Sequence, residues 1–101
     1  MEVNVTTKND RAIMTLRGRF DFNSHRDFRG SYDEILKAGN IKTLEVDMSS
    51  VDYLDSSALG MLLLLKERAS SVKIELELSH CQGMVKQVLD VANFGKIFKI
   101  T

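Results

Sequence analysis

The chain has 101 residues, 44% of them hydrophobic, and its 14 basic residues balance its 14 acidic ones. This length and apolar content suit one folded domain over residues 1–101 and argue against a disordered chain. A net charge of zero argues against general nucleic-acid binding, because such binding requires a basic surface that releases counterions from the phosphates.

The sequence lacks features that direct a chain into or across a membrane. The longest apolar run, Ala58–Leu65, is far too short to span a bilayer. Residues Met1–Asn4 lack the basic and apolar regions of a signal peptide. The single cysteine, Cys81, excludes an internal disulfide and suits a reducing compartment. We therefore expect a cytoplasmic protein without membrane insertion, in which Cys81 is a small, partly buried apolar residue.

The N-terminal part of the chain predicts a β-hairpin. Residues Glu2–Thr7 and Ala12–Phe20 alternate apolar and polar side chains, as half-buried strands do. Residues Lys8–Arg11 between them favour a turn, so the two strands should pair in an antiparallel manner.

A helix should follow the hairpin, because apolar residues recur at helical spacing from Phe28 to Leu36. Ser24 is the expected cap at its start, with Asp27 three residues further on as a weak capping-box partner. Gly39 and Asn40 should end this helix.

The central part of the chain predicts a strand, a loop and a strongly apolar helix. Residues Thr43–Met48 alternate as a strand, and Ser49–Leu54 are expected to form a loop. The next helix should begin at Asp55 or Ser56, since either side chain can accept hydrogen bonds from the first free backbone N–H groups. The helix is apolar on nearly every side as far as Lys66, so we expect it to be buried.

The C-terminal part completes an alternating pattern of strands and helices. Residues Val72–Leu78 predict a strand with one solvated face, Gln82–Ala92 a last helix, and Ile97–Ile100 a final strand or tail. The order is β-β-α-β-α-β-α-β. Strand–helix–strand units favour parallel pairing, and the hairpin adds an antiparallel pair. We therefore expect an α/β fold with a mixed sheet and helices mainly on one face.

Motifs of the common enzyme classes are absent from the sequence. There is no Gly-x-Ser-x-Gly elbow, no Walker loop and no dinucleotide-binding fingerprint. Neither His25 nor His80 has partners at a spacing typical of metal or catalytic sites. We expect a protein that is not an enzyme and that has no metal or cofactor.

One long motif resembles a known family. Residues Asp47–Gly60 read Asp-Met-Ser-Ser-Val-Asp-Tyr-Leu-Asp-Ser-Ser-Ala-Leu-Gly, which resembles the central motif of the STAS domain nearly position for position. The strand end Gly18–Asp21 and the segments Val88–Leu89 and Asn93–Phe98 also resemble that family, so the similarity covers essentially the whole chain. The STAS domain is the fold of bacterial anti-sigma factor antagonists, which the resemblance implies here.

The resemblance also implies a switching mechanism. In that family the serine directly after the motif aspartate is phosphorylated by a serine kinase that is also an anti-sigma factor. The unmodified protein binds this kinase and frees the sigma factor, the phosphorylated form releases it, and a phosphatase resets the system. The resemblance implies that Ser56 is the phosphoacceptor and that Asp21, Asp55 and Ser57 contribute to partner binding. We expect a monomer or a weak dimer.

The residues themselves leave other interpretations open. By position alone, Ser56 is a helix cap and Asp21 is a turn residue. An alternative function is a non-phosphorylated STAS subunit of a lipid-transport ABC complex, bound to an ATPase. A small-molecule or nucleotide sensor is a third, which the lack of a phosphate-binding glycine loop disfavours. The intact Asp55-Ser56-Ser57 core favours the switch.

Overall fold

The computed structural model describes residues 1–101 and contains a five-stranded sheet in the order β1-β2-β3-β4-β5. β1 is antiparallel to β2, and all other neighbouring strands are parallel. This confirms the predicted mixed sheet and element order. The strands are β1 (Glu2–Lys8), β2 (Arg11–Phe20), β3 (Thr43–Leu54), β4 (Glu75–Ser79) and β5 (Lys99–Ile100). The helices are α1 (His25–Ala38), α2 (Ser56–Ser71) and α3 (Gly83–Val91), with 3-10 turns η1 (Phe22–Ser24) and η2 (Phe94–Lys96).

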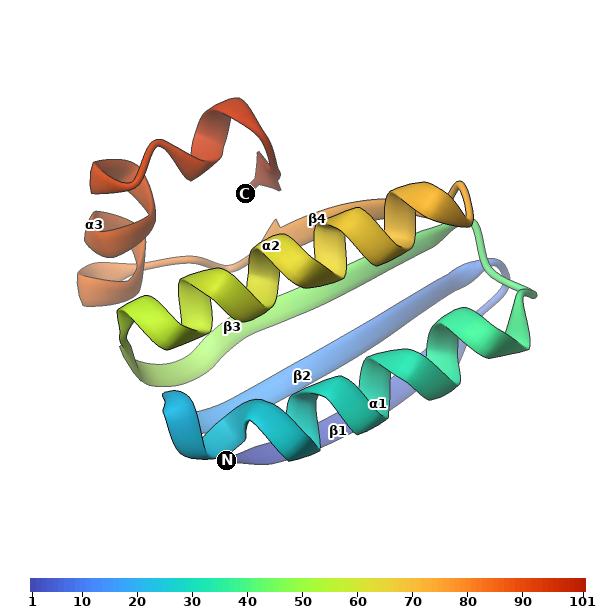
Figure 1. Ribbon diagram of the computed structural model, residues 1–101, viewed down its shortest axis with the longest axis horizontal. Helices are drawn as coiled ribbons and strands as arrows, with labels where there is room; N and C mark the ends of the chain where they lie inside the picture. Colours follow the sequence, from blue (N-terminus) through green and yellow to red (C-terminus); the bar gives the residue numbers. More distant parts are fainter.

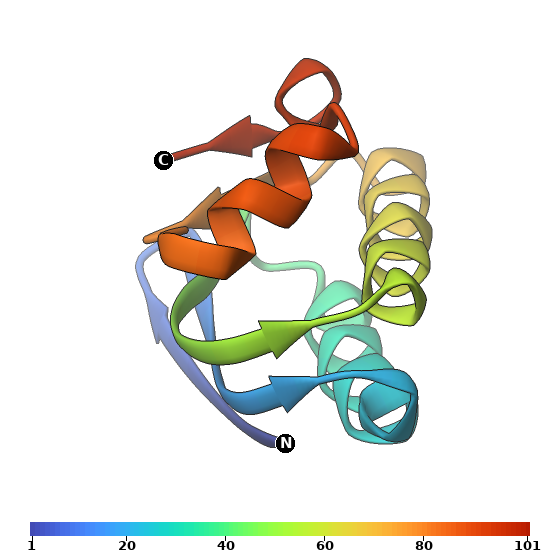
Figure 2. The same ribbon diagram turned by 90° about the vertical axis from the view of Figure 1, so that its left-hand side faces the viewer.

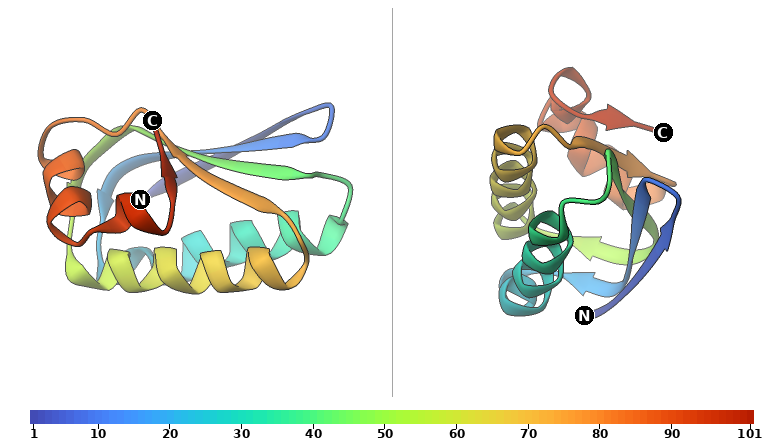
Figure 3. Two further views of the ribbon diagram at one scale, coloured as in Figure 1. Left: turned by 90° about the horizontal axis from the view of Figure 1, so that it is seen from above. Right: turned by 90° about the vertical axis from the view of Figure 1, so that its right-hand side faces the viewer.

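Helices α1 and α2 lie side by side on one face of the sheet, as predicted (Figure 1, Figure 2). They run in the same direction, so their N-termini lie at the same end of the molecule. This arrangement follows from parallel strands that are added in one direction, because right-handed crossovers then place successive helices on one face. Helix α3 lies near that same end, where it contacts β3 (Figure 3).

An aromatic cluster anchors the end of the molecule at which α1 and α2 begin. The ring of Phe20, at the end of β2, lies 4.8 Å from that of Phe28, which meets the Tyr32 ring edge-on at 5.3 Å. All three side chains are buried in a single core of 24 hydrophobic residues. Burial raises the pKa of the Tyr32 hydroxyl. The cluster fixes where the two helices start relative to the sheet.

The predicted loop over Ser49–Leu54 is wrong, because these residues continue strand β3. From Met48 to the end of the strand, the buried positions are Met48, Val51 and Leu54, which are spaced by three residues and not by two. The cause is two register shifts against β2, each of which gives β3 one more residue than its partner. Such bulges break the alternation by which strands are recognised in a sequence.

Gly18 on β2 is required at the second of these shifts. Its φ of +100° is a backbone conformation that residues with a Cβ rarely adopt, and it pairs with Val51 directly before the register changes. On β3 itself, the Asp47 carboxylate accepts a hydrogen bond of 2.9 Å from the Ser49 N–H. This local bond satisfies a backbone group at the irregular part of the strand.

The strand predicted over Val72–Leu78 begins later, as β4 (Glu75–Ser79). Val72 still belongs to the end of α2, since its N–H donates to the Ala69 carbonyl at 3.2 Å. Lys73 adopts a φ of 59°, which ends the helix and redirects the chain. The apolar alternation therefore starts at the end of α2, three residues before the first paired residue of β4.

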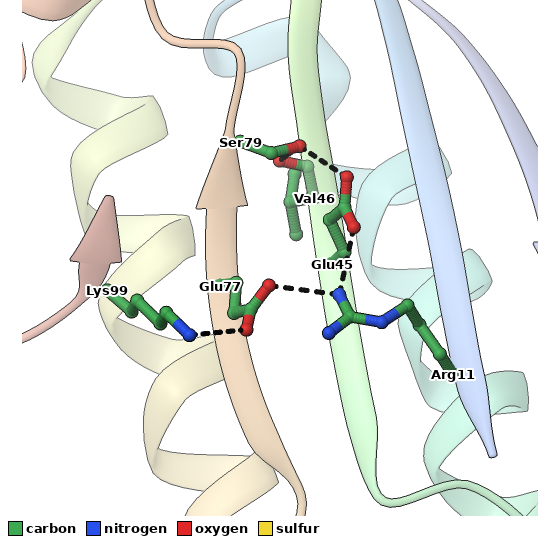
Figure 4. A network of polar contacts seen from close by, with 6 residues as sticks. All are labelled: Arg11, Glu45, Val46, Glu77, Ser79 and Lys99. Atoms are coloured by element: carbon green, nitrogen blue, oxygen red, sulfur yellow. Dashed lines mark hydrogen bonds and ion pairs between the residues drawn. The ribbon is translucent and has the colours of Figure 1, made fainter. Parts of the chain in front are cut away.

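The sheet face that lies away from α1 and α2 carries an ion-pair network (Figure 4). Arg11 on β2 donates to Glu45 on β3 and to Glu77 on β4, both at 2.9 Å. Lys99 on β5 lies 3.2 Å from Glu77, and the Ser79 hydroxyl donates to Glu45 at 2.7 Å. The hydrogen bond from Arg11 lowers the pKa of Glu77. The sheet face that was predicted to be solvated does carry polar side chains, but Glu77 and Ser79 are buried in it. The contacts of this network join strands β2, β3, β4 and β5.

Candidate partner-binding site at the N-terminus of helix α2

The register of β2 and β3 brings two of the predicted site residues together. Phe20 and Leu54 are paired at the ends of these parallel strands, so the residues that follow them, Asp21 and Asp55, emerge at the same edge. The Asp55 N–H also donates to the Phe20 carbonyl at 3.4 Å. Two carboxylates thus lie at the end of the sheet where both crossover helices begin.

Asp55 is the cap of helix α2. Its carboxylate accepts a hydrogen bond of 3.0 Å from the Ala58 N–H, and its backbone is extended. The alternatives left open by the sequence, Asp55 or Ser56, are thereby resolved. Ser56 is the first residue of the helix, its side chain is exposed, and its hydroxyl makes no hydrogen bond within the protein.

Asp21 is also a cap, but of the 3-10 turn η1. Its carboxylate accepts from the Asn23 N–H at 3.0 Å, and its own N–H donates to the Ser24 hydroxyl at 3.3 Å. Ser24 is the N-cap residue of helix α1 by position, as predicted, but its side chain makes no capping hydrogen bond there, and the predicted capping box with Asp27 is wrong. The chain enters α1 through η1, so capping occurs one turn earlier, and the buried Ser24 hydroxyl donates to the Arg19 carbonyl at 2.9 Å.

Arg19 holds the Asp21 side chain from the side of β2. Its guanidinium lies 3.5 Å from the Asp21 carboxylate and 4.0 Å from the centre of the Tyr53 ring. A cation over an aromatic face is a favourable contact. Sequence reasoning missed this role, because the pairing of Arg19 with Tyr53 depends on the bulged register of β3.

An apolar groove of about 260 Å³ opens between α1 and α2 and is lined by Ser57, the residue after Ser56. Ser57 is partly buried in its wall, and Phe22 at its edge is 73% exposed. The remaining lining residues are His25, Phe28, Arg29, Tyr32, Gly60, Met61 and Leu64.

A second apolar groove, of about 390 Å³, lies between α2 and α3. It is lined mainly by Leu59, Val88 and Val91, and Val91 is 84% exposed. The first turns of α2 are therefore flanked by apolar surface on both sides.

The expectation that helix α2 is buried holds for one side only. Leu62 and Leu65 are completely buried, whereas Leu63 and Leu64 are 43% and 37% exposed. The helix lies in the outer layer, so a helix that is apolar all round must expose part of that surface. The all-round apolar pattern was the one feature of the sequence that could have predicted the grooves.

The remaining predicted features lie apart from this site. Cys81 is half-buried, as predicted, and burial raises the pKa of its thiol to about 11. His25 lies in the α1–α2 groove, and no three His, Cys, Asp or Glu side chains are grouped so that they could hold a metal ion. None of the helices has the length and apolar character needed to cross a membrane.

The fold and the Asp-capped helix after β3 define the class of this domain, and comparison with known proteins gives its family. The model of the STAS domain matches residues 2–101, and the chain belongs to this family. The chain is 42% identical over 86 residues to the STAS-domain containing protein PA14_20770 of Pseudomonas aeruginosa, strain UCBPP-PA14. That match covers 85% of this chain and 83% of the relative.

Solved structures of similar proteins show the same fold. The Thermotoga maritima protein TM1081 superposes with a TM-score of 0.87 at 23% identity, over 97% of this chain and 84% of that one. The anti-sigma factor antagonist SpoIIAA, a Bacillus cell fate determinant, superposes in its unphosphorylated form with a TM-score of 0.82 at 16% identity, over 99% and 88% of the two chains. Its phosphorylated form gives 0.75 at 15% identity, over 99% and 91%.

Proposed function

We propose that this chain is an anti-sigma factor antagonist that works as a phosphorylation-controlled partner switch. The unmodified protein binds an anti-sigma factor that is also a serine kinase and so releases the kinase's target. Phosphorylation of Ser56 ends this binding, and a phosphatase restores it. The observation that carries the proposal is that the exposed Ser56 hydroxyl makes no hydrogen bond within the chain and directly precedes Ser57, which lines an apolar groove.

The position of Ser56 suits a phosphoacceptor. A kinase must reach the hydroxyl, and this side chain is exposed at the first position of α2. Because Asp55 accepts the Ala58 N–H, the helix does not need the Ser56 oxygen as a cap. Ser57 is less accessible, since it is partly buried in the groove wall. The fold thus favours modification of the first serine over the second.

The two grooves beside α2 suit a protein partner. Exposed apolar side chains on both sides of α2, among them Phe22, Leu64 and Val91, give a partner apolar area to bury around the acceptor. Asp21 and Asp55 are largely engaged by contacts within the chain. Their contribution to partner binding is therefore mainly to fix the shape of this surface and to add negative charge to it.

A phosphate on Ser56 would act on such a partner through charge and desolvation. It adds a charge of about −1.5 to −2 next to two carboxylates. A partner that fills the grooves must cover this group, and burying an unpaired charge is unfavourable. For a partner carboxylate about 6 Å away, the added repulsion is about 1.4 kcal/mol in water and about 5.5 kcal/mol at an effective dielectric constant of 20. Even the smaller value weakens binding about tenfold.

The proposed setting is the bacterial cytoplasm, where such a kinase and its ATP are found. The net charge of zero fits this scheme, because the chain controls its target through a protein partner and does not itself bind nucleic acid. The chain acts as a binding module, and the kinase and the phosphatase supply the chemistry.

The test is recovery of the tagged protein from its native cells, with phosphosite mapping and identification of the bound proteins. We expect one phosphate, on Ser56, and a kinase-type ATPase bound only to the unmodified form. Ser56→Ala should retain this partner, Ser56→Asp should lose it, and Ser70→Asp, which adds the same charge at the far end of α2, should retain it. An unmodified Ser56 in every growth condition, with a transporter ATPase as partner, would instead establish the lipid-transport function.

A further inference from the structure

Strand β1 forms an open edge of the sheet. It pairs only with β2, and no backbone hydrogen bond other than those of that pairing involves residues 2–8. Proteins usually protect such an edge with a proline, a bulge or an inward-pointing charge. The chain has no proline, and the β1–β2 register runs without a shift over seven residue pairs. The outer edge of β1 is therefore a regular, unprotected template for another strand.

The residues of β1 are complementary to those of β1 in a second copy of the chain that runs antiparallel to it. In an antiparallel pair centred on Val5, Glu2 of each chain stands opposite Lys8 of the other. Val3 then faces Thr7, and the intervening Asn4 faces Thr6. We infer that two copies of this chain associate through β1, in antiparallel register about a two-fold axis at Val5, to give one continuous sheet. A two-fold interface requires such self-complementarity.

The charges at the ends of β1 favour this register. Lys8 stands opposite Arg11 of β2, whose guanidinium contacts Glu45 and Glu77, and Lys8 itself forms no ion pair within the chain. At the other end, the exposed carboxylate of Glu2 lies 3.9 Å from Arg17, a distance at the limit of an ion pair. A second copy places Glu2 against Lys8 twice, once at each end. Opposite charges that face each other across strands stabilise the pair.

Val5 gains most from the association. It is 44% exposed, although its neighbour Val3 packs against the core. In the dimer the two Val5 side chains face each other across the axis and exclude water. Because only one pair of seven-residue strands joins the chains, the buried area is below that of a standard stable interface, so the dimer should be weak. The phosphoacceptor site follows β3, two strands away from this edge, and remains accessible in both copies.

Sedimentation equilibrium of the unmodified chain from micromolar to millimolar concentration tests this inference. We expect a reversible monomer–dimer equilibrium, which Glu2→Lys or Lys8→Glu should weaken about tenfold, since each change replaces two attractive pairs by two repulsive ones. The double variant Glu2→Lys with Lys8→Glu should restore the dimer, because it exchanges the two charges. The matched control exchanges the exposed α3 pair in Lys86→Glu with Asp90→Lys and should change nothing.

A cross-link provides a second test that does not depend on charge. Opposed residues in an antiparallel pair have Cα atoms about 4.5–5.5 Å apart, which is within the range for a disulfide. Val5→Cys in a Cys81→Ser background should therefore form a disulfide-linked dimer under mild oxidation, whereas Lys37→Cys on α1 should not. A monomer at all concentrations, or a dimer that neither single charge reversal weakens, would overturn the inference. Substitutions at Ser56 leave this equilibrium unchanged, so it is independent of the proposed switch.

Discussion

Phosphorylation of Ser56 should leave the stability of the fold almost unchanged. Two electrostatic effects oppose each other at this position. The free N–H groups and the dipole at the start of α2 favour a negative charge by about 0.3–1 kcal/mol per unit, or about 0.6–2 kcal/mol for a phosphate dianion. Repulsion from the Asp55 carboxylate, at a separation of about 6 Å in water, opposes this by about 1.4 kcal/mol. The two contributions nearly cancel.

We therefore expect the free energy of unfolding of the phosphorylated chain to lie within about 1 kcal/mol of the unmodified value. The assay is urea denaturation followed by far-ultraviolet circular dichroism, since the chain has no tryptophan for fluorescence. Phosphoserine is placed at position 56 alone. Because both contributions are screened by salt, any difference should shrink further at high ionic strength.

The neighbouring serine provides the matched control. Phosphoserine at Ser57 has nearly the same relation to the helix dipole, but its side chain is partly buried in the apolar α1–α2 groove. It should reduce the free energy of unfolding by at least about 1 kcal/mol more than phosphoserine at Ser56, because an unpaired charge is desolvated. A loss of more than about 2 kcal/mol for Ser56 itself, or a general change in the NMR shifts of core methyl groups, would refute switching by surface charge.

Three further outcomes follow from individual contacts. Asp55→Ala should lower the free energy of unfolding by about 1 kcal/mol, because the Ala58 N–H loses its 3.0 Å partner, whereas Asp55→Asn should cost only a few tenths in urea denaturation. The pKa of Glu77 is lowered by Arg11, so its stabilisation is complete above the ordinary value of 4.5 and is lost as the pH falls through the lower folded value. Glu77→Gln should therefore cost about 1–2 kcal/mol at pH 7 and reduce the acid sensitivity seen in denaturation at pH 3. Because burial raises the pKa of Cys81 from 9.0 to about 11, iodoacetamide at pH 7.5 should alkylate the native thiol about 100-fold more slowly than the unfolded one.

Local chemistry made much of the fold predictable. The hairpin turn contains Asn9 with a φ of 57°, and Gly39 ends α1 with a φ of 66°, both as turn and cap residues should. The N-terminus of α2 was predicted to within one residue, because small polar side chains give way abruptly to apolar ones. The resemblance to the STAS motif then identified Ser56 as the residue to examine.

The features that could not be predicted all depend on distant residues. Ser49–Leu54 form a strand because β2 pairs with them through two bulges, and no periodicity within the segment reveals this. Arg11 contacts Glu77 across 66 positions in sequence, so an alternating strand pattern cannot show that this carboxylate is buried. Likewise, the α1–α2 groove exists only once two helices pack on one sheet. Sequence reasoning therefore led to Ser56 as the proposed phosphorylation site but not to the apolar surface near it.

In the proposed switch, the division of roles between Asp55 and Ser56 would allow Ser56 to be phosphorylated without loss of the fold. If the Ser56 oxygen capped α2, its phosphorylation would replace the group that accepts hydrogen bonds from the first helical N–H groups, and the start of the helix would have to rearrange around the phosphate. Because the Asp55 carboxylate accepts the hydrogen bond from the Ala58 N–H, the helix cap and the proposed phosphorylation site are separate atoms on adjacent residues. The buried half of α2, which includes Leu62 and Leu65, then holds the tip in place. A partner at this surface therefore encounters a change of charge on an unchanged shape, and such a change can be reversed by removing the phosphate alone.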